Sequence, residues 1–497
     1  MSQPRSELQR KFFQIGFNKC GTTFIAKLFQ MNGIPTLHWL EGRLAEDIAY
    51  SKLVGRQPLK PWADSITAFT DMESVRYLNM PVVEAFKEFE FLDKSYPGSV
   101  FLLNTRDVED WVISRYMHRD GTYARAYAQI LGVGLIDLAD IWADAWNDHI
   151  AACRSYFAGR AEFVEIDIDH ADPGDYRDAL APWFDLPNCP PRSGRNRAQV
   201  RRNYLIKLDR MLNAKPPERD MPAEDRDALA DRLALAAAPA LIQLGAGGVS
   251  PRSDLFAVFD VTAGQVIDRN GRQLPFRQDR DGWYHLDPVR RDLLPLASAV
   301  NDIAQVVRHG TYHLDMSSTL PDHDRPTIAP IRRADARNVF LWPAAWTHRL
   351  GNNGYLGDPD RDETPWADKL DLAVDPAKLP ADRRKDDFIL SHRYVVSQGR
   401  DANFLSLLNS RSLVLRAEDG CEDAVSPVFQ SWRHFIPLQS DAADLDAQLA
   451  WARAHPAECQ RISSNARTLC KGLADPRVRC RQLAQVLHDY RVATGQE

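Results

Sequence analysis

Residues 12–23 read FFQIGFNKCGTT, an apolar run that passes through a glycine-containing turn into residues that favour a helix. Backbone N–H groups in such a turn, together with those at the helix start, commonly hold phosphate. The stretch differs from a nucleotide-triphosphate loop, G-x-x-x-x-G-K-[ST], because Thr22 stands where lysine would follow the second glycine. Lys19 lies inside the turn instead. A glycine turn with an exposed lysine would look similar, but the pattern favours a short phosphate-containing group.

The same apolar rhythm continues from Lys11 to about Leu186, where short apolar runs alternate with amphipathic stretches. This alternation is typical of βαβ units, so we predict an α/β fold with a doubly wound parallel sheet. The expected strands are Phe12–Gly16, Gly33–Leu37, Ile66–Thr70, Val100–Thr105 and Glu162–Ile168. The expected helices are Thr22–Met31, Pro81–Lys94, Val108–His118, Leu138–Phe157 and Pro173–Phe184.

A second phosphate-binding element is expected at residues 101–115, which read FLLNTRDVEDWVISR. Arg106 follows the apolar strand, at the sheet edge where doubly wound folds bind ligands. Ser114 lies about two helical turns further on and can point back at the same group. An arginine with a hydroxyl suits one isolated phosphate. A surface ion pair with Asp107 is the alternative for Arg106, and a solvated helix face is the alternative for Ser114.

Together, these two stretches resemble the 5′-phosphosulfate loop and the 3′-phosphate element of sulfotransferases that use 3′-phosphoadenosine-5′-phosphosulfate (PAPS). The resemblance covers about residues 10–205. It implies a P-loop-type α/β fold, transfer of a sulfuryl group from PAPS to a hydroxyl or amine, release of 3′,5′-ADP and no metal requirement. It also implies a donor site made of Gly16, Lys19, Cys20, Gly21, Thr22, Thr23, Arg106 and Ser114.

Three further roles concern the loop over the nucleotide, the leaving group and the general base. A basic tract that contains Arg195 falls where the family often has a loop over the nucleotide, although a solvated charge run is an equal alternative. Lys19 is expected to stabilise the bridging oxygen as the sulfuryl group leaves. A general base must accept the acceptor's proton, and the candidates are Asp71, His38 and Glu41, in that order. An aspartate at a strand end is also a common helix cap or turn residue.

The C-terminal half also shows strand and helix alternation, with strand, polar turn, helix and strand expected over residues 389–438. Residues 399–403 read GRDAN and could hold a diphosphate at a helix start. Residues 429–438 read FQSWRHFIPL, and amphipathic helices are expected over 441–490. This half resembles glycosyltransferase family 90, which includes protein O-glucosyltransferases and enzymes that modify capsule or lipopolysaccharide.

The resemblance to family 90 implies a second, Rossmann-like α/β domain and a UDP-sugar as a second co-substrate. The family's Trp-Arg-Gly element is missing, because Lys369 is followed by LDLAVDP. The donor site is therefore expected to be weakened or lost. The sugar-nucleotide candidates are Arg393, Arg400 and Asn403, with Arg332 and Arg333 as further replacements for the missing arginine.

Length and composition set the wider expectations. A chain of 497 residues predicts two domains, which we place at 1–205 and 254–497 with a helix-containing linker at 206–253. The net charge of −6 argues against a nucleic-acid-binding protein. With neither a signal-peptide stretch nor a membrane-spanning apolar run, a cytoplasmic location is expected, and peripheral membrane contact stays open. Seven scattered cysteines predict neither a disulfide framework nor a metal site.

The leading hypothesis is thus a sulfotransferase that acts on a carbohydrate or glycolipid acceptor, with a glycosyltransferase-like second half. One alternative is a bifunctional enzyme whose main activity is glycosyl transfer from a UDP-sugar. A nucleotide kinase is another, disfavoured because the loop lacks lysine at the usual position and no strand ends in an evident magnesium-binding aspartate. A non-catalytic carbohydrate-binding or scaffold protein is the last.

Overall fold

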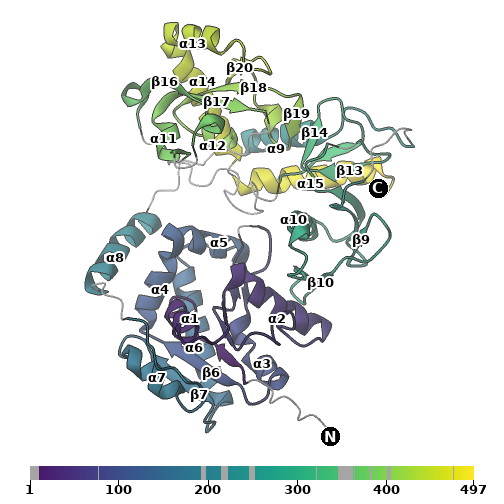
Figure 1. Cartoon of the computed structure of the whole chain (residues 1–497). Coiled ribbons are helices and arrows are strands. Elements are labelled where there is room, and N and C mark those ends of the chain that lie inside the picture. Colours follow the sequence, from purple (N-terminus) through teal and green to yellow (C-terminus); the bar gives the residue numbers. More distant parts are fainter. Residues whose placement is uncertain are drawn as a thin grey trace. The chain divides into compact units, whose positions relative to one another are not determined.

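A computed structural model describes residues 10–497, except 77, 192–196, 214–221, 246–251, 321, 345–361, 363, 381–382, 385, 400–403 and 474. The chain forms two compact units (Figure 1). The first contains residues 1–214 with 275–291, and the second contains 215–274 with 292–497. The predicted domain boundaries remain predictions, because this division does not test them.

The first unit is built on a five-stranded sheet in the order β2-β3-β1-β6-β7, with all neighbours parallel. Its strands are β1 Phe12–Gln14, β2 Thr36–His38, β3 Ala68–Thr70, β6 Val100–Thr105 and β7 Phe163–Asp167. A short antiparallel pair is formed by β4 Glu73–Ser74 and β5 Val83–Glu84. The order puts β1 between β3 and β6, so its two neighbours come from different parts of the chain. A crevice for ligands is expected at this switch point.

Helices cover both faces of this sheet. Alternate side chains on each strand point to opposite faces and therefore enter different hydrophobic cores. Phe12 packs with α1 Thr22–Met31 and α7 Pro173–Leu180, whereas Phe13 packs in the core of the opposite face. The other helices are α2 Arg43–Val54, α3 Phe89–Ser95, α4 Val108–Tyr116, α5 Thr122–Leu131, α6 Leu138–Tyr156 and α8 Arg197–Asn213. The α/β prediction is confirmed.

A hairpin from the middle of the chain also belongs to the first unit. It consists of β10 Phe276–Gln278 and β11 Tyr284–Leu286, and it contacts α2. Arg56 on the loop after α2 bonds Asp287 at 2.9 Å, while the second carboxylate partner of Arg56, Asp47, is buried. No feature of the sequence predicted that residues 275–291 would join the first unit.

The second unit contains two larger sheets. A mixed sheet has the order β15-β13-β12-β8-β9, and a parallel sheet has the order β16-β17-β18-β20. The mixed sheet comprises β8 Phe256–Asp260, β9 Gln265–Asp268, β12 Thr311–Asp315, β13 Thr327–Ala329 and β15 Val339–Leu341. The parallel sheet comprises β16 Leu370–Val374, β17 His392–Gln398, β18 Leu413–Ala417 and β20 Ile436–Leu438.

Helices and one small strand pair complete the second unit. Arg332 in β14 Ile331–Arg333, which pairs with β19 Cys421–Asp423, donates to four main-chain carbonyl groups: those of Ala236, Ala237, Ala238 and Val339. The helices are α9 Ala223–Ala237, α10 Leu294–Val306, α11 Asp386–Leu390, α12 Phe404–Leu408, α13 Leu445–Ala454, α14 Pro456–Leu473 and α15 Pro476–Ala493. The predicted α/β character is therefore confirmed for this unit as well.

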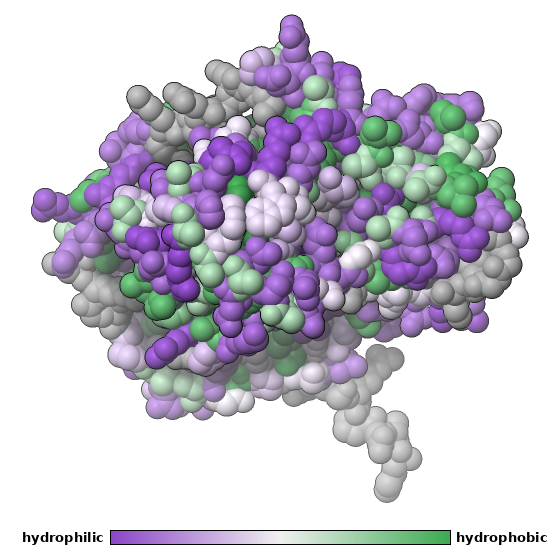
Figure 2. Space-filling view, turned by 90° about the horizontal axis from the view of Figure 1, so that it is seen from above, coloured by the Kyte–Doolittle hydropathy of each residue, from purple (hydrophilic) through white to green (hydrophobic). Residues whose placement is uncertain are grey.

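The surface and composition of the described residues add three findings. Hydrophilic residues predominate on the face drawn in Figure 2, with hydrophobic residues in small groups among them. Among the described residues, none of the helices combines the length and the apolar character that crossing a membrane requires. The same residues contain no cluster of three or more histidine, cysteine or acidic side chains arranged to hold a metal ion.

One charged group lies in the centre of the first unit. Arg115 on α4 is completely buried, and its Nη2 lies 2.5 Å from Glu73 Oε1 and 2.8 Å from Glu84 Oε1. The Tyr123 hydroxyl bonds both Arg115 and Glu73. One buried cation faces two carboxylates, so ionisation of both would leave a buried negative charge unbalanced, which costs free energy. Burial raises the pKa of Glu73 to about 7, whereas Arg115 and Lys87 overcome burial and hold the pKa of Glu84 at about 2.

The raised pKa of Glu73 predicts a pH dependence of stability. The carboxyl group keeps a proton up to about pH 7 when folded but loses it near 4.5 when unfolded. The folded state binds more protons in that window, so the free energy of unfolding should fall as pH rises through it. Glu73→Gln stays neutral and should gain stability relative to wild type between about pH 5 and about pH 8.

Urea denaturation of both proteins at the two pH values measures this difference. Glu90→Gln is the matched control, because Glu90 is exposed and pairs only with Lys94 among the described residues. Parallel pH dependences for wild type and Glu73→Gln would show that Glu73 is ionised throughout the range.

Candidate functional site

The turn after β1 is fixed from behind by Asn104 on β6. The Asn104 amide donates to the Cys20 carbonyl and accepts a 2.8 Å bond from the Gln14 side chain. A Cβ on Gly16 would lie 2.2 Å from Asn104 Oδ1, so only glycine fits there. Lys19 and Gly21 both have positive φ, at 64° and 83°. This left-handed backbone turns the chain sharply into α1.

The start of α1 suits an anion. Its first turn has no acidic residue, and no side chain caps its N–H groups. The first N–H groups of a helix have no intrahelical partners and carry a partial positive charge. The turn and helix start therefore present donors where the sequence predicts a phosphate.

One cavity of about 760 Å³ collects both predicted phosphate-binding elements at the carboxyl edge of the first sheet. The residues that line it come from the turn after β1, the ends of β2 and β3, helix α4, the segment after β7 and helix α8. Those that the sequence singled out and that line the cavity are Lys19, Gly21, Thr22, Thr23, His38, Asp71, Arg106 and Ser114. Segments about a hundred residues apart thus meet in one site.

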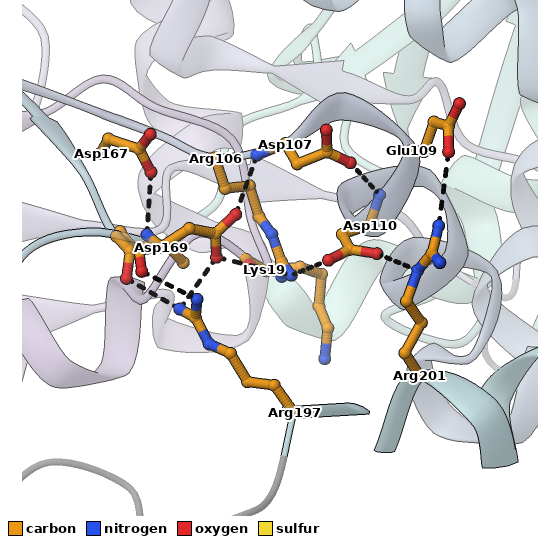
Figure 3. Close-up of polar contacts among 10 residues, drawn as sticks. Lys19, Arg106, Asp107, Glu109, Asp110, Asp167, Asp169, Arg197 and Arg201 are labelled. Atoms are coloured by element: carbon orange, nitrogen blue, oxygen red, sulfur yellow. Dashed lines mark hydrogen bonds and ion pairs between the residues drawn. The ribbon is translucent and has the colours of Figure 1, made fainter. Parts of the chain in front are cut away.

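Arg106 joins the two elements directly. Its guanidinium donates to the Lys19 carbonyl at 3.2 Å, and it lies 4.0 Å from Asp110 and 3.9 Å from Asp169 (Figure 3). Arg106 Nε is buried and has no hydrogen-bond partner among the described residues. A cation with an unused buried donor beside the phosphate turn fits the anion-binding role that the sequence predicts for it.

Helix α8 brings two more arginines to the cavity. Arg197 lies 2.8 Å from Asp169 and donates to the carbonyls of Ile168 and Asp169 (Figure 3). Arg201 lies 2.5 Å from Asp110 and 3.3 Å from Glu109. The sequence singled out this basic tract, but Arg195 lies outside the described residues. Asp169 was missed, although an aspartate just after a strand at the carboxyl edge was a signal for it.

The two leading base candidates lie side by side. His38 Nε2 is 3.7 Å from Asp71 Oδ2 and 3.5 Å from the Thr23 hydroxyl, while His38 Nδ1 contacts the Thr70 hydroxyl at 2.9 Å. Burial raises the pKa of Asp71, and the charges of His38 and Lys19 oppose this. Glu41 pairs instead with Arg291 and is not among the residues that line the cavity. The geometry therefore favours His38 and Asp71 over Glu41.

The loop is also held by a residue that the sequence did not predict. Glu73 lines the cavity, and its Oε2 accepts a 2.5 Å bond from the Asn18 side chain. The Trp111 indole donates to the Asn18 carbonyl at 3.0 Å. Through Glu73, the buried Arg115 is connected to the phosphate turn. The sequence carried no signal for this role of Glu73, because Asn18 and Glu73 are 55 residues apart.

Two of the predicted donor-site residues pack against the rest of the first unit and do not face the cavity. Gly16 packs against Asn104, and the Cys20 thiol is buried in the hydrophobic core. Burial raises the pKa of this thiol far above its usual range. Neither residue is among those that line the cavity. They contribute to the packing that holds the turn, and any direct role in donor binding remains a prediction.

The sugar-nucleotide candidates of the second unit are only partly placed. Arg400 and Asn403 lie outside the described residues. Arg393 donates to the carbonyls of Trp366 and Ala367, both at 3.1 Å, and lies 3.5 Å from Asp371. Arg416 was missed by the sequence prediction. It is the last residue but one of β18 and is buried, with its guanidinium carbon 3.9 Å from the centre of the Phe404 ring.

Comparison with protein families matches residues 388–491 to Glycosyl transferase family 90. The matched segment begins within α11 and includes β17, β18, β20 and most of α15. No curated protein matches the chain. The comparisons give no support for a sulfotransferase domain, so that expectation depends on the residues of the first unit alone. The chain thus carries a glycosyl transferase family 90 domain at residues 388–491, which indicates a transferase.

Proposed function

We propose that the first unit transfers a sulfuryl group from PAPS to a hydroxyl group of a carbohydrate. The observation that carries this proposal is the shared cavity, in which a phosphate turn, Arg106 with Ser114, and the His38–Asp71 pair face one space. A donor with two separate phosphate-bearing ends needs two separate anion sites. The turn after β1 and the Arg106–Ser114 pair supply them on adjacent strands.

In the proposed reaction, His38 or Asp71 accepts the proton of the acceptor hydroxyl. The acceptor oxygen forms a bond to sulfur, and the bond from sulfur to the bridging phosphate oxygen breaks. The leaving 3′,5′-ADP carries the resulting negative charge, which Lys19 and the N–H groups of the turn stabilise. The His38 and Asp71 side chains lie at the ends of neighbouring strands β2 and β3, on one side of the turn after β1.

A second candidate function is glycosyl transfer from a UDP-sugar, and the family match supports it more directly than anything supports sulfuryl transfer. In this reaction an acceptor oxygen bonds the anomeric carbon as the bond from that carbon to the diphosphate breaks. The absent Trp-Arg-Gly element argues for a weakened donor site. A chain with both activities would modify glycans in two ways.

Nucleotide selectivity tests the first activity. Because Arg106 and Ser114 are proposed to hold the 3′-phosphate, 3′,5′-ADP should bind about tenfold to a hundredfold more tightly than 5′-AMP or ATP. Arg106→Ala should remove most of this preference, whereas Arg154→Ala, which alters an exposed arginine outside the cavity, should retain it. Calorimetric titration measures all of these affinities. Equal binding of ATP with magnesium would favour a kinase instead.

Kinetics separate the roles of Lys19 and the base. Lys19→Ala should lower the rate constant of transfer more than it weakens 3′,5′-ADP binding, because the product lacks the departing sulfuryl group. Asp71→Asn and His38→Gln, compared in single-turnover reactions, should show which group accepts the proton. Loss of the base typically costs about a hundredfold or more. Near-normal turnover in both variants would exclude both candidates.

A donor screen tests the second activity. UDP- and GDP-sugars should bind weakly, because loss of one charge-assisted arginine contact reduces affinity by about tenfold to over a hundredfold. Extracted surface glycans serve as acceptors in a transfer assay with radiolabelled sugar donors. Robust sugar transfer that Arg400→Ala or Arg416→Ala abolishes would contradict a weakened site and show a bifunctional enzyme.

A further inference from the structure

The cavity of the first unit has two ends, which follow from the order of the strands. Arg106 and Ile168, which line the β6 and β7 side, follow the last two strands of the sheet. His38 and Trp39 line the opposite side, at β2, the other edge strand. The edge strands β2 and β7 are each two strands from β1, so their backbones lie about 10 Å from that of β1, on opposite sides of it. The β6–β7 end is the proposed nucleotide end, which leaves the β2 end for the acceptor.

An aromatic ring and a cation occupy the β2 end. The guanidinium carbon of Arg119 lies 5.2 Å from the centre of the Trp39 ring, and both residues line the cavity. Trp39 directly follows the base candidate His38, and its N–H donates to the Thr70 carbonyl at 2.9 Å. Arg119 lies in the turn His118–Gly121 after α4. Two separate segments therefore bring a stacked pair to the place where an acceptor would enter.

The backbone around both residues is held in an uncommon conformation. Trp39, Leu40 and Glu41 have φ values of 57°, 50° and 56°, and Arg119 and Asp120 have φ values of 50° and 53°. Non-glycine residues rarely adopt such values, and runs of them persist only where the surrounding structure imposes them. Such constraints are common at ligand sites. The stacked pair is thus positioned in advance of binding.

Arg119 differs from the other arginines that line the cavity in its lack of an ion pair among the described residues. Arg106, Arg197 and Arg201 each lie within 4.0 Å of a carboxylate. Within the described part of the chain, the guanidinium of Arg119 forms no such ion pair. Its neighbour Asp120 pairs instead with Lys207 at 3.3 Å.

The remaining titratable groups around Arg119 do not supply a negative charge either. Burial, together with the charges of Lys19 and Arg119, lowers the pKa of His118 to about 4, so that imidazole is neutral near pH 7. Asp71 lies beside His38, and Glu73 is bonded to Arg115 and Asn18. The β2 end therefore presents an aromatic face with an adjacent cation that no carboxylate of the described residues balances.

We propose that this pair binds an acidic sugar of the acceptor, with the sugar ring against Trp39 and its carboxylate on Arg119. This inference rests on the proposed sulfuryl transfer, and it names the acceptor class as a hexuronate-containing saccharide. A guanidinium presents two parallel N–H donors that match a carboxylate, and an indole face offers a flat apolar surface. A neutral sugar would use only the second of these.

Direct binding without the donor tests the proposal. Calorimetric titrations of the full chain use trisaccharides of galacturonate, mannuronate and guluronate, each with its carboxyl-reduced counterpart. At least one acidic trimer should bind about tenfold or more tightly than its reduced form. Arg119→Gln should abolish that difference, and Arg119→Lys should retain part of it. Trp39→Ala should weaken both forms, and Trp39→Phe should retain most of the affinity.

Arg154→Gln, which alters an arginine outside the cavity, is the matched control and should bind like wild type. Thermal midpoints show whether each variant is folded. Equal affinity for acidic and reduced trimers, persistence of the preference in Arg119→Gln, or no binding of any acidic trimer would overturn the proposal. Failure of 3′,5′-ADP to bind would instead contradict sulfuryl transfer, and acid-selective binding could still be observed.

Discussion

The contact between Asn104 and the turn after β1 is the constraint on which the first unit's site depends. Asn104 lies near the end of β6, immediately before the residues that lead to Arg106, and its side chain bonds the turn on which Lys19 lies. The same packing leaves no room for a side chain at Gly16. One amide therefore holds together the two elements that are predicted to bind anions. Gln14 extends this set of bonds to β3, because its side chain also accepts from the Asp71 N–H at 2.9 Å.

That arrangement explains which parts of the site the sequence could predict. The phosphate turn and the Arg106 element are local patterns, and the predicted helix Thr22–Met31 and strand Val100–Thr105 agree with α1 and β6. Helices α2 and α5 were not predicted. Both segments nevertheless carry helical signals that the sequence analysis did not use: in α2 the buried residues Leu44, Ala45 and Ile48 follow helical spacing, and the α5 segment is amphipathic. The predicted break at 187–203 also overlaps the start of α8.

Residues whose roles come from tertiary contacts were beyond sequence reasoning. Glu73 is identifiable only through Arg115 and Asn18. Asp169 shows its role through Arg106 and Arg197, although its place just after β7 was a signal in the sequence. For Arg393, the sequence predicted a cation that could bind a diphosphate. Its guanidinium instead donates to the carbonyls of residues 366 and 367. A charged residue at a strand end is a candidate by position, but its partners decide whether its charge is available to a ligand.

The distribution of charge in the first unit is compatible with the proposed polyanionic donor, although the net charge of the chain is −6. Three arginines at the proposed nucleotide end are paired with Asp110 and Asp169, so their charge is largely balanced within the protein. A phosphate that binds Arg106 would repel both carboxylates, and the arginines of α8 offset this because they bond the same two residues. Binding would thus exchange ion pairs rather than bury unpaired charges, which keeps the desolvation cost moderate. Arg119 forms no ion pair with a carboxylate of the described residues, because the adjacent Asp120 pairs with Lys207. An acidic group at Arg119 would therefore gain attraction without displacing a carboxylate, and the two ends of the cavity would bind anions by different electrostatic means.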